Sequence, residues 1–358
     1  PIIAAGSLLE FVLEDTKIEI PVGRIEYLYM GPMSFSEFLL AQNKNKLADV
    51  FTNSRKQIEN ILNHDNRDLL NPSQLNSSFF PQGVFELLTE EFKTYLYVGG
   101  MPEAVKVYAE TKDLNLVRKV QNSIISTYKD DFHKYAKKSE VARMDIIFEK
   151  LPIMVGKKMK YSELDSDMQS RDIKKVLHLL KLARVIHFCH HTHCSGFPLS
   201  ASKDMNTFKI YFLDVGLYYA TIGVRWSQLQ SDLKNENLAQ GTAAEQFVAQ
   251  HLAYSSDCSG SRNLTMQEPN LMYWLRDKGS SKAEVDFVLD LGQQVIPIEV
   301  KSGKTGQLRS VKQMALEKSL VKKIVRFDLK YRDKIVDEFE PKKSLINLHI
   351  VCAEWIHS

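Results

Sequence analysis

The last third of the chain shows two hydrophobic periods, one typical of helices and one typical of strands. From about residue 241 onward, the pattern predicts a helix, three strands, a second helix and a fourth strand. The segments are residues 243–254 (helix), 271–275, 284–289 and 295–301 (strands), 308–320 (helix) and 323–328 (strand). Helices and strands mixed in this order predict an α/β unit at this end of the chain.

The middle of the chain has a mainly helical pattern that ends in a strand. The predicted segments are helices over residues 144–151, 161–164 and 173–180 and a strand over residues 185–189. This order is typical of a winged helix, which presents its third helix to DNA. Ser170 is expected to cap that helix, and its solvent side is expected to carry Lys174, Lys175 and Lys181. These three lysines are therefore candidate DNA-binding residues.

The first hundred residues predict one strand followed by helices. Residues 2–5 form a short apolar run closed by Gly6 and Ser7, as in a buried strand of a parallel sheet. Such a strand needs neighbours, and we expect them upstream. Apolar residues at helical spacing over 35–40 and 85–92 predict a small helical lid. The chain is thus expected to be mixed α/β with three domains, over residues 1–110, 111–225 and 226–358.

Composition changes this picture little. The chain has 358 residues, of which 44% are hydrophobic and 25% charged, enough to form more than one core. Its formal net charge of +3 gives no global argument for nucleic acid, so any basic surface must be local. The four cysteines are irregularly spaced, and no apolar run approaches the roughly 18 residues of a membrane helix. We therefore expect a cytoplasmic protein without a disulfide framework or a membrane segment.

Acidic residues in two of the predicted strands carry the candidate chemistry. Alternation places Glu299 and Lys301 on one face of their strand, and a short connection to the preceding strand predicts a hairpin in which Asp286 lies beside Glu299. Glu245 shares its helix face with apolar residues, so its burial needs compensation. Two carboxylates can hold magnesium or manganese, and a lysine can act on water or phosphate. A structural ion pair between the strands remains the alternative.

Several segments together resemble a large family of prokaryotic AAA-type ATPases whose C-terminal domain of unknown function has the PD-(D/E)xK restriction-endonuclease fold. The resemblance extends over almost the whole chain in the family's order. Its residues are Gly6 and Ser7; Gly23 and Arg24; Pro32, Ser34, Phe35, Glu37 and Phe38; Gly99, Gly100, Pro102 and Glu103; Lys209, Tyr211, Phe212, Asp214, Gly216 and Leu217; Tyr273 to Arg276; Glu284 to Val288; and Ile298 to Lys301.

The resemblance implies a remnant of an ATPase core and lid, a winged helix and a nuclease-like domain. Ser7 and Arg24 would be the remnant of nucleotide sensing, and homo-oligomers through AAA-type contacts would be possible. The Walker A and Walker B segments have no counterpart in this sequence, so we expect no ATP hydrolysis by this chain, with ATP a ligand only of a longer protein. In a nuclease-like site, Asp286 and Glu299 would hold Mg²⁺ or Mn²⁺, and Glu245 and Lys301 would complete the catalytic set.

Three functions stay open at this stage. The chain could be a DNA-binding and regulatory module, an active Mg²⁺-dependent DNA endonuclease, or a protein-interaction platform that contacts no nucleic acid. Two other patterns carry less weight. The segment 187–194 is rich in histidine and cysteine, but its spacing fits no usual zinc pattern, and we expect the polar wing of a winged helix there. Residues 303–305 imitate the end of a phosphate-binding loop without its first glycine.

Overall fold

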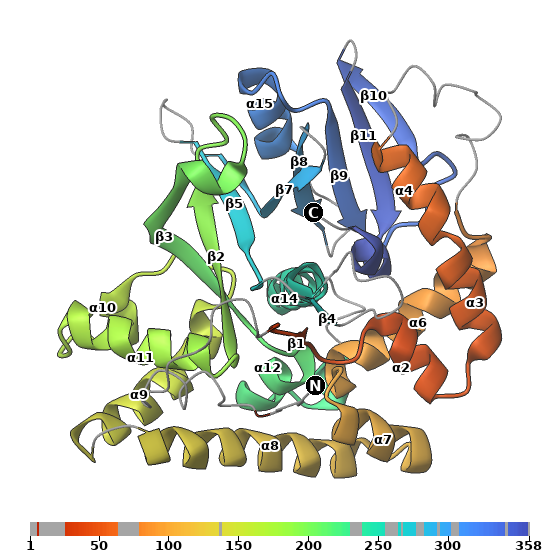
Figure 1. Cartoon of the computed structure of the whole chain (residues 1–358). Helices are drawn as coiled ribbons and strands as arrows, with labels where there is room; N and C mark the ends of the chain where they lie inside the picture. The colour runs from red at the N-terminus through yellow and green to blue at the C-terminus, as the bar shows by residue number, and fades with distance from the viewer. Residues whose placement is uncertain are drawn as a thin grey trace.

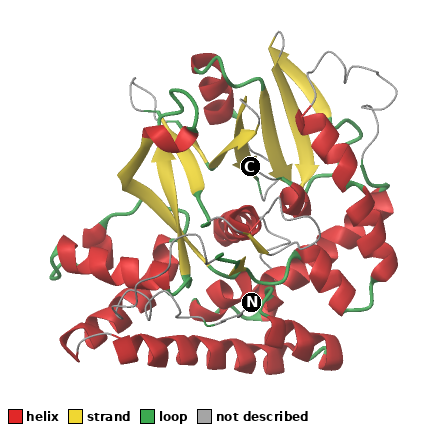
Figure 2. Ribbon diagram, in the orientation of Figure 1, coloured by secondary structure: helices red, strands yellow, loops and turns green. Residues whose placement is uncertain are grey.

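The computed structural model of the chain has a mixed α/β architecture, in which one long helix lies between two sheets (Figures 1 and 2). The central helix is α14 (Leu238–Tyr254), seen end-on in Figure 1. The structure describes residues 6, 26–63, 79–135, 138–229, 238–254, 264–265, 268–276, 283–291, 294–301, 308–340 and 343–356. The predicted strand over residues 2–5 lies outside these described residues.

The N-terminal part is the predicted set of helices. They are α2 (Phe35–Ala41), α3 (Asn45–Asn53), α4 (Arg55–Asn63), α6 (Gln82–Val98) and α7 (Pro102–Thr111). Helix α2 begins where it does because Ser34 and Glu37 form a reciprocal capping box. The buried Glu354 carboxylate also accepts a hydrogen bond from the Ser34 hydroxyl (3.0 Å), which ties α2 to the C-terminal end of the described chain. A two-residue strand β1 (Tyr29–Met30) pairs with β4 (Leu264–Thr265).

The middle part follows the predicted order of helix, short helix, helix and strand. Its elements are α8 (Leu114–Tyr135), α9 (Lys138–Met154), α10 (Tyr161–Leu164), α11 (Ser170–Leu182), β2 (Ile186–Thr192), η1 (Leu199–Ser202), β3 (Lys203–Phe212) and α12 (Val215–Thr221). Residue Gln169 occupies the N-cap of α11, and its side chain makes no capping hydrogen bond. The expectation that Ser170 caps this helix is therefore wrong by one residue.

Two sheets flank α14. The four-stranded sheet has the order β3-β2-β5-β6, and the five-stranded sheet has the order β10-β11-β9-β8-β7. The strands not yet given bounds are β5 (Leu271–Leu275), β6 (Glu284–Val285), β7 (Phe287–Leu291), β8 (Gln294–Val300), β9 (Lys323–Asp328), β10 (Val336–Glu340) and β11 (Lys343–His349). The C-terminal part also contains the helices α15 (Arg309–Glu317) and η2 (Ile350–Trp355). Strand β2 pairs in parallel with β5, so one sheet continues across the expected boundary between residues 225 and 226.

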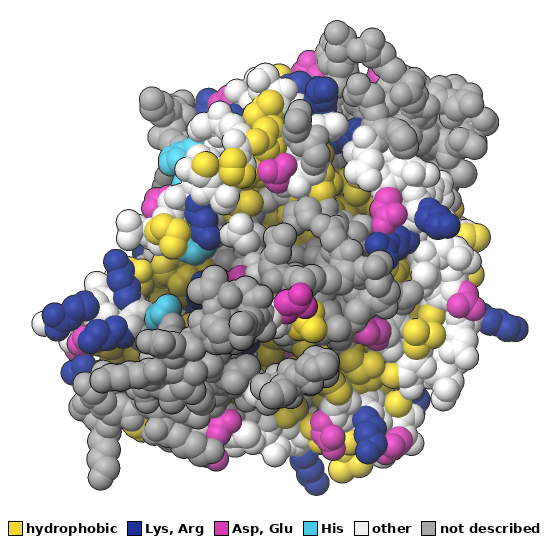
Figure 3. All heavy atoms as spheres, viewed as in Figure 1, with side chains coloured by type: hydrophobic (Ala, Val, Ile, Leu, Met, Phe, Trp, Pro, Cys, Tyr) yellow, Lys and Arg dark blue, Asp and Glu magenta, His cyan; other side chains and the backbone are white. Residues whose placement is uncertain are grey.

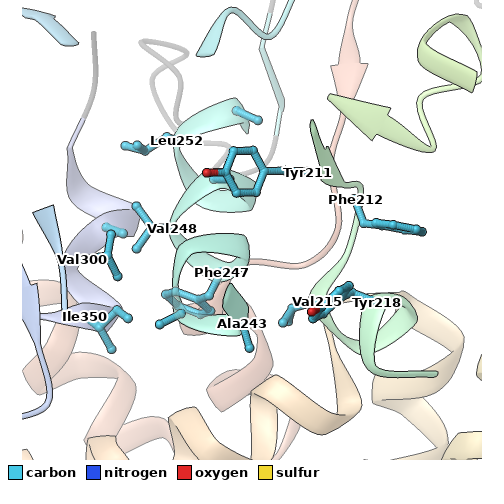
Figure 4. Packing of buried hydrophobic residues seen from close by; sticks show 14 of the residues in the cluster. Tyr211, Phe212, Val215, Tyr218, Ala243, Phe247, Val248, Leu252, Val300 and Ile350 are labelled. Atoms are coloured by element: carbon cyan, nitrogen blue, oxygen red, sulfur yellow. The ribbon is translucent and has the colours of Figure 1, made fainter. Parts of the chain in front are cut away.

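Helix α14 joins the two sheets because both of its sides are covered. Phe212 and Val215 lie on one side of it, and Val300 and Ile350 lie on the other (Figure 4). Its buried polar side chains also bind neighbouring backbone. Gln246 accepts from the Phe212 N–H and donates to the Phe212 carbonyl, both at 2.7 Å. Such paired bonds satisfy buried groups and fix β3 against the helix.

A tight joint connects the N-terminal helices to the middle part. Buried Asp214 caps α12 by accepting from Leu217 N (2.9 Å), and its other oxygen accepts from Gly100 N (2.6 Å). Gly99 has φ +74° and ψ −170°, and a Cβ at this position would lie 2.8 Å from Asp214 Cγ. This backbone region is essentially restricted to glycine. The two segments named for the resemblance thus meet in one contact.

None of the described helices combines the length and apolar character that a membrane crossing requires.

Candidate functional site

Asp286 and Glu299 lie beside each other at the end of the β7–β8 pair. The predicted antiparallel hairpin is confirmed, with Phe287 opposite Ile298, so the next residues in register are Asp286 and Glu299. Asp286 itself is a bend between β6 and β7. Its Oδ2 accepts a hydrogen bond from Val300 N at 2.8 Å, which fixes the carboxylate against β8.

Glu299 is buried and forms an ion pair with Lys301. The Glu299 residue is 6% exposed, and its Oε1 contacts the ammonium group of Lys301. Its other oxygen, Oε2, is buried and has no hydrogen-bond partner among the described residues. An unpartnered carboxylate oxygen is costly to bury, so this atom marks an incompletely satisfied position.

Glu245 approaches from α14. Its Oε2 accepts a hydrogen bond from the Tyr211 hydroxyl on β3 at 3.2 Å. Gly156, with φ +73°, passes so close that an added Cβ would lie 3.0 Å from the same oxygen. The backbone thus leaves room for the Glu245 carboxylate, which also lies close enough to Asp286 for the Asp286 charge to raise its pKa.

Sequence reasoning missed a second lysine in this cluster. The Lys209 residue on β3 is 1% exposed, and its ammonium group forms an ion pair with Glu284. Lys209 and Tyr211 point to the same side of β3 because they are two residues apart. The alternation of side chains along a strand predicts that Lys209 and Tyr211 share a face. Their partners Glu284 and Glu245 lie at least 34 positions away along the chain, so only the folded structure shows these contacts. We name Glu245, Glu284, Asp286, Glu299, Lys209 and Lys301 the carboxylate–lysine cluster.

The charges of the cluster are out of balance, with four carboxylates against two lysines. Burial, followed by the charge of nearby Asp286, raises the pKa values of Glu245 and Glu299. Burial also raises the pKa of Asp286. Burial alone would lower the pKa of Lys209, but Glu245, Asp286 and Glu284 raise it above its ordinary value. The cluster therefore favours a charged lysine and protonated carboxyl groups.

These residues do not fit a divalent metal centre in their present positions. Across the described part of the chain, no three His, Cys, Asp or Glu side chains are placed so that they could hold a metal ion. Asp286 and Glu299 are neighbours, yet Glu299 is engaged by Lys301 and Asp286 by backbone. A magnesium ion would need these oxygens turned toward one point.

The cluster should make stability depend on pH. A carboxyl whose folded pKa is raised binds more protons in the folded state, so its contribution to stability falls as pH rises above its ordinary value of 4.5. Between pH 4.5 and about 8, the free energy of unfolding is expected to fall less steeply with pH in Glu245→Gln than in the wild type. The difference in slope is at most about 1.4 kcal/mol per pH unit. Urea unfolding measured from pH 5 upward at about half-unit steps checks this.

Glu110→Gln, on the exposed face of α7, is the matched control and should keep the wild-type slope. An unchanged slope in Glu245→Gln would contradict a proton-binding role of the cluster.

A second candidate surface lies on α11. Ile173, Val176, Leu177 and Leu180 are buried, whereas the opposite face is exposed. The exposed residues at helical spacing are Arg171, Lys174, Lys175 and His178, which we name the α11 stripe. Of the three predicted DNA-binding lysines, Lys174 and Lys175 belong to it. Lys181 is instead partly buried and ion-paired with Glu268 at 2.7 Å.

The histidine-rich strand differs from the expectation of a polar wing. His187, His190 and His191 on β2 are buried. The reason is that β2 lies between β3 and β5, so both of its edges are paired. Burial, followed by the charge of Arg184, lowers the pKa of His187 to about 3. The nucleotide-sensing candidates Ser7 and Arg24, and the segment 303–305, lie outside the described residues.

Two family models match separate segments of the chain. Residues 89–228 match a family described as a domain of unknown function (DUF8612), and residues 240–350 match another with the same description (DUF4143). No curated protein and no solved structure matches the chain. Lys209 of the carboxylate–lysine cluster lies in the first matched segment, whereas the four carboxylates and Lys301 lie in the second. The cluster is thus shared between the two.

Proposed function

We propose that the chain is a nucleic-acid-binding module that contacts the DNA backbone through α11. The observation that carries this proposal is the α11 stripe, in which Arg171, Lys174, Lys175 and His178 are exposed on the face of α11 opposite its buried residues. The positive charges of Arg171, Lys174 and Lys175 on one helix face are complementary to a phosphate backbone. The small net charge of +3 means that this local row, and not the whole molecule, supplies the attraction.

The neighbouring turn extends the same surface. Lys157, Lys158 and Lys160 are exposed between α9 and α10. The Lys174 ammonium lies 5.5 Å from the ring centre of Tyr161, the residue after Lys160, so the turn and the stripe adjoin. Figure 3 shows Lys and Arg side chains gathered on the side of the molecule where α10 and α11 lie. Phosphate contacts of this kind position a protein without reading sequence.

We also propose that the chain contains a winged helix and a nuclease-like domain. The order α9, α10, α11, β2, β3 supports a winged helix, with α11 as the helix presented to DNA. The DUF4143 match is typical of proteins associated with AAA-type ATPases, and the paired strands β7, β8 and β9 beside α15 support a nuclease-like C-terminal domain. We propose that an ATPase core of a longer protein regulates this module and that AAA-type contacts of that core form homo-oligomers.

Binding to duplex DNA of random sequence tests the proposal. Wild-type protein is expected to bind weakly, with little sequence preference and an affinity that falls steeply between about 50 and about 200 mM salt. Fluorescence anisotropy with labelled duplexes measures this. Absence of binding at the lowest salt concentration would refute the proposal and would leave a protein-interaction platform as the better account.

Nuclease activity is a second candidate with one observation in its favour. Asp286, Glu299 and Lys301 lie together, and the buried Glu299 Oε2 has no hydrogen-bond partner among the described residues. Because the described carboxylates do not form a metal centre, we expect no cleavage of single-stranded, duplex or branched DNA by this chain with Mg²⁺ or Mn²⁺. Cleavage that Glu299→Gln abolishes would make the nuclease account the correct one.

A further inference from the structure

We propose that Lys209 is the resident cation of the carboxylate–lysine cluster and that it excludes a divalent metal ion from it. This inference is independent of DNA binding by α11. It concerns what the cluster can bind, because a buried ammonium group and a metal ion would compete for the same oxygens.

The position of Lys209 carries the argument. Its side chain is 1% exposed, and its ammonium pairs with Glu284 while lying close enough to Glu245 and Asp286 to feel their charges. The ring centre of Tyr273 lies 5.0 Å from the same nitrogen. A lysine is rarely buried to this degree unless its charge is compensated, and here three carboxylates compensate it.

The arrangement of the carboxylates agrees with an ammonium group and not with a metal ion. No metal-holding trio forms among the described residues, although the charge of Asp286 acts on both Glu245 and Glu299. A divalent ion placed among them would be repelled by Lys209 and by Lys301. Removing the Lys209 charge would leave Glu284, Asp286 and Glu245 uncompensated, which is the condition that attracts a divalent cation.

Manganese titration monitored by electron paramagnetic resonance tests the proposal. Wild-type protein is expected to show no saturable Mn²⁺ site that depends on Glu299. Lys209→Met, which removes the charge and keeps an unbranched side chain of nearly the same length, should gain one site at least about tenfold tighter than any binding by the wild type. Adding Glu299→Gln to Lys209→Met should remove that site. Lys209→Arg keeps the charge and should behave like the wild type.

Lys203→Met is the matched control, because Lys203 is on the same strand but bonds to Asn270 (3.0 Å) outside the cluster. It should leave Mn²⁺ binding unchanged. If Lys209→Met does not fold, Lys209→Gln replaces it, with circular dichroism as the check on folding. Two results would overturn the proposal: a folded neutral variant that gains no site, or a wild-type Mn²⁺ site that Glu299→Gln abolishes. The second result needs no variant of Lys209.

Discussion

Replacing Gly99 with alanine is expected to lower the free energy of unfolding by about 3 kcal/mol. Two costs add. The backbone conformation at Gly99, with φ +74° and ψ −170°, is one that residues with a Cβ adopt only under strain. The new methyl group would also meet Asp214, which cannot withdraw without releasing its hydrogen bonds to Gly100 N and Leu217 N. Leaving such buried donors without acceptors is costly.

Gly83→Ala provides the matched control. Gly83 lies in α6, and an added Cβ there would meet nothing within 4 Å. Alanine favours a helix over glycine by up to about 1 kcal/mol, so this variant should be as stable as the wild type or more stable. Urea denaturation of both variants measures the difference. Equal stability of Gly99→Ala and wild type would show that the joint between the end of α6 and Asp214 is not tight.

Sequence patterns predicted the local elements well where they depend on periodicity. Strand β5 has the predicted bounds, α10 has the predicted bounds, and the β7–β8 hairpin places Asp286 beside Glu299 as alternation required. The hydrophobic spacing also separated the buried and exposed faces of α11. Each of these features is set by residues that are close together in the sequence.

The sequence could not show contacts that join distant segments. Lys209 and Glu284 are 75 positions apart, and their pairing depends on how the four-stranded sheet assembles around α14. For the same reason, pairing with β5 buries the histidines of β2, although their composition suggested a polar wing. Lys181 was placed on the correct helix, but its partner Glu268 lies in a distant loop. Strands β10 and β11 were also not predicted.

The largest functional effect is expected from the α11 stripe. Arg171, Lys174 and Lys175 are exposed on one helix face, so replacing all three with alanine removes three cations without opening the core. Each phosphate contact contributes about 0.9 to the slope of log affinity against log salt concentration. The triple variant should therefore lose about 2 to 3 units of slope, and its affinity at low salt should fall by at least about tenfold.

Two controls separate the stripe from general charge. Lys106→Ala combined with Lys119→Ala removes two exposed lysines from α7 and α8, and should leave DNA affinity near the wild-type value. Lys181→Ala should change the salt slope less than Lys174→Ala does, because Lys181 is already neutralised by Glu268. Thermal unfolding of each variant establishes that the fold is intact before affinities are compared.

The most direct test of DNA binding by α11 is the salt dependence of duplex affinity for the wild type and the variant lacking Arg171, Lys174 and Lys175. Fluorescence anisotropy from about 50 to about 200 mM salt gives both slopes. A slope that is smaller by about 2 to 3 units in the variant, with the Lys106 and Lys119 control unchanged, is the predicted result. Identical slopes and affinities for the variant and the wild type would contradict it, because α11 would then make no contact with DNA.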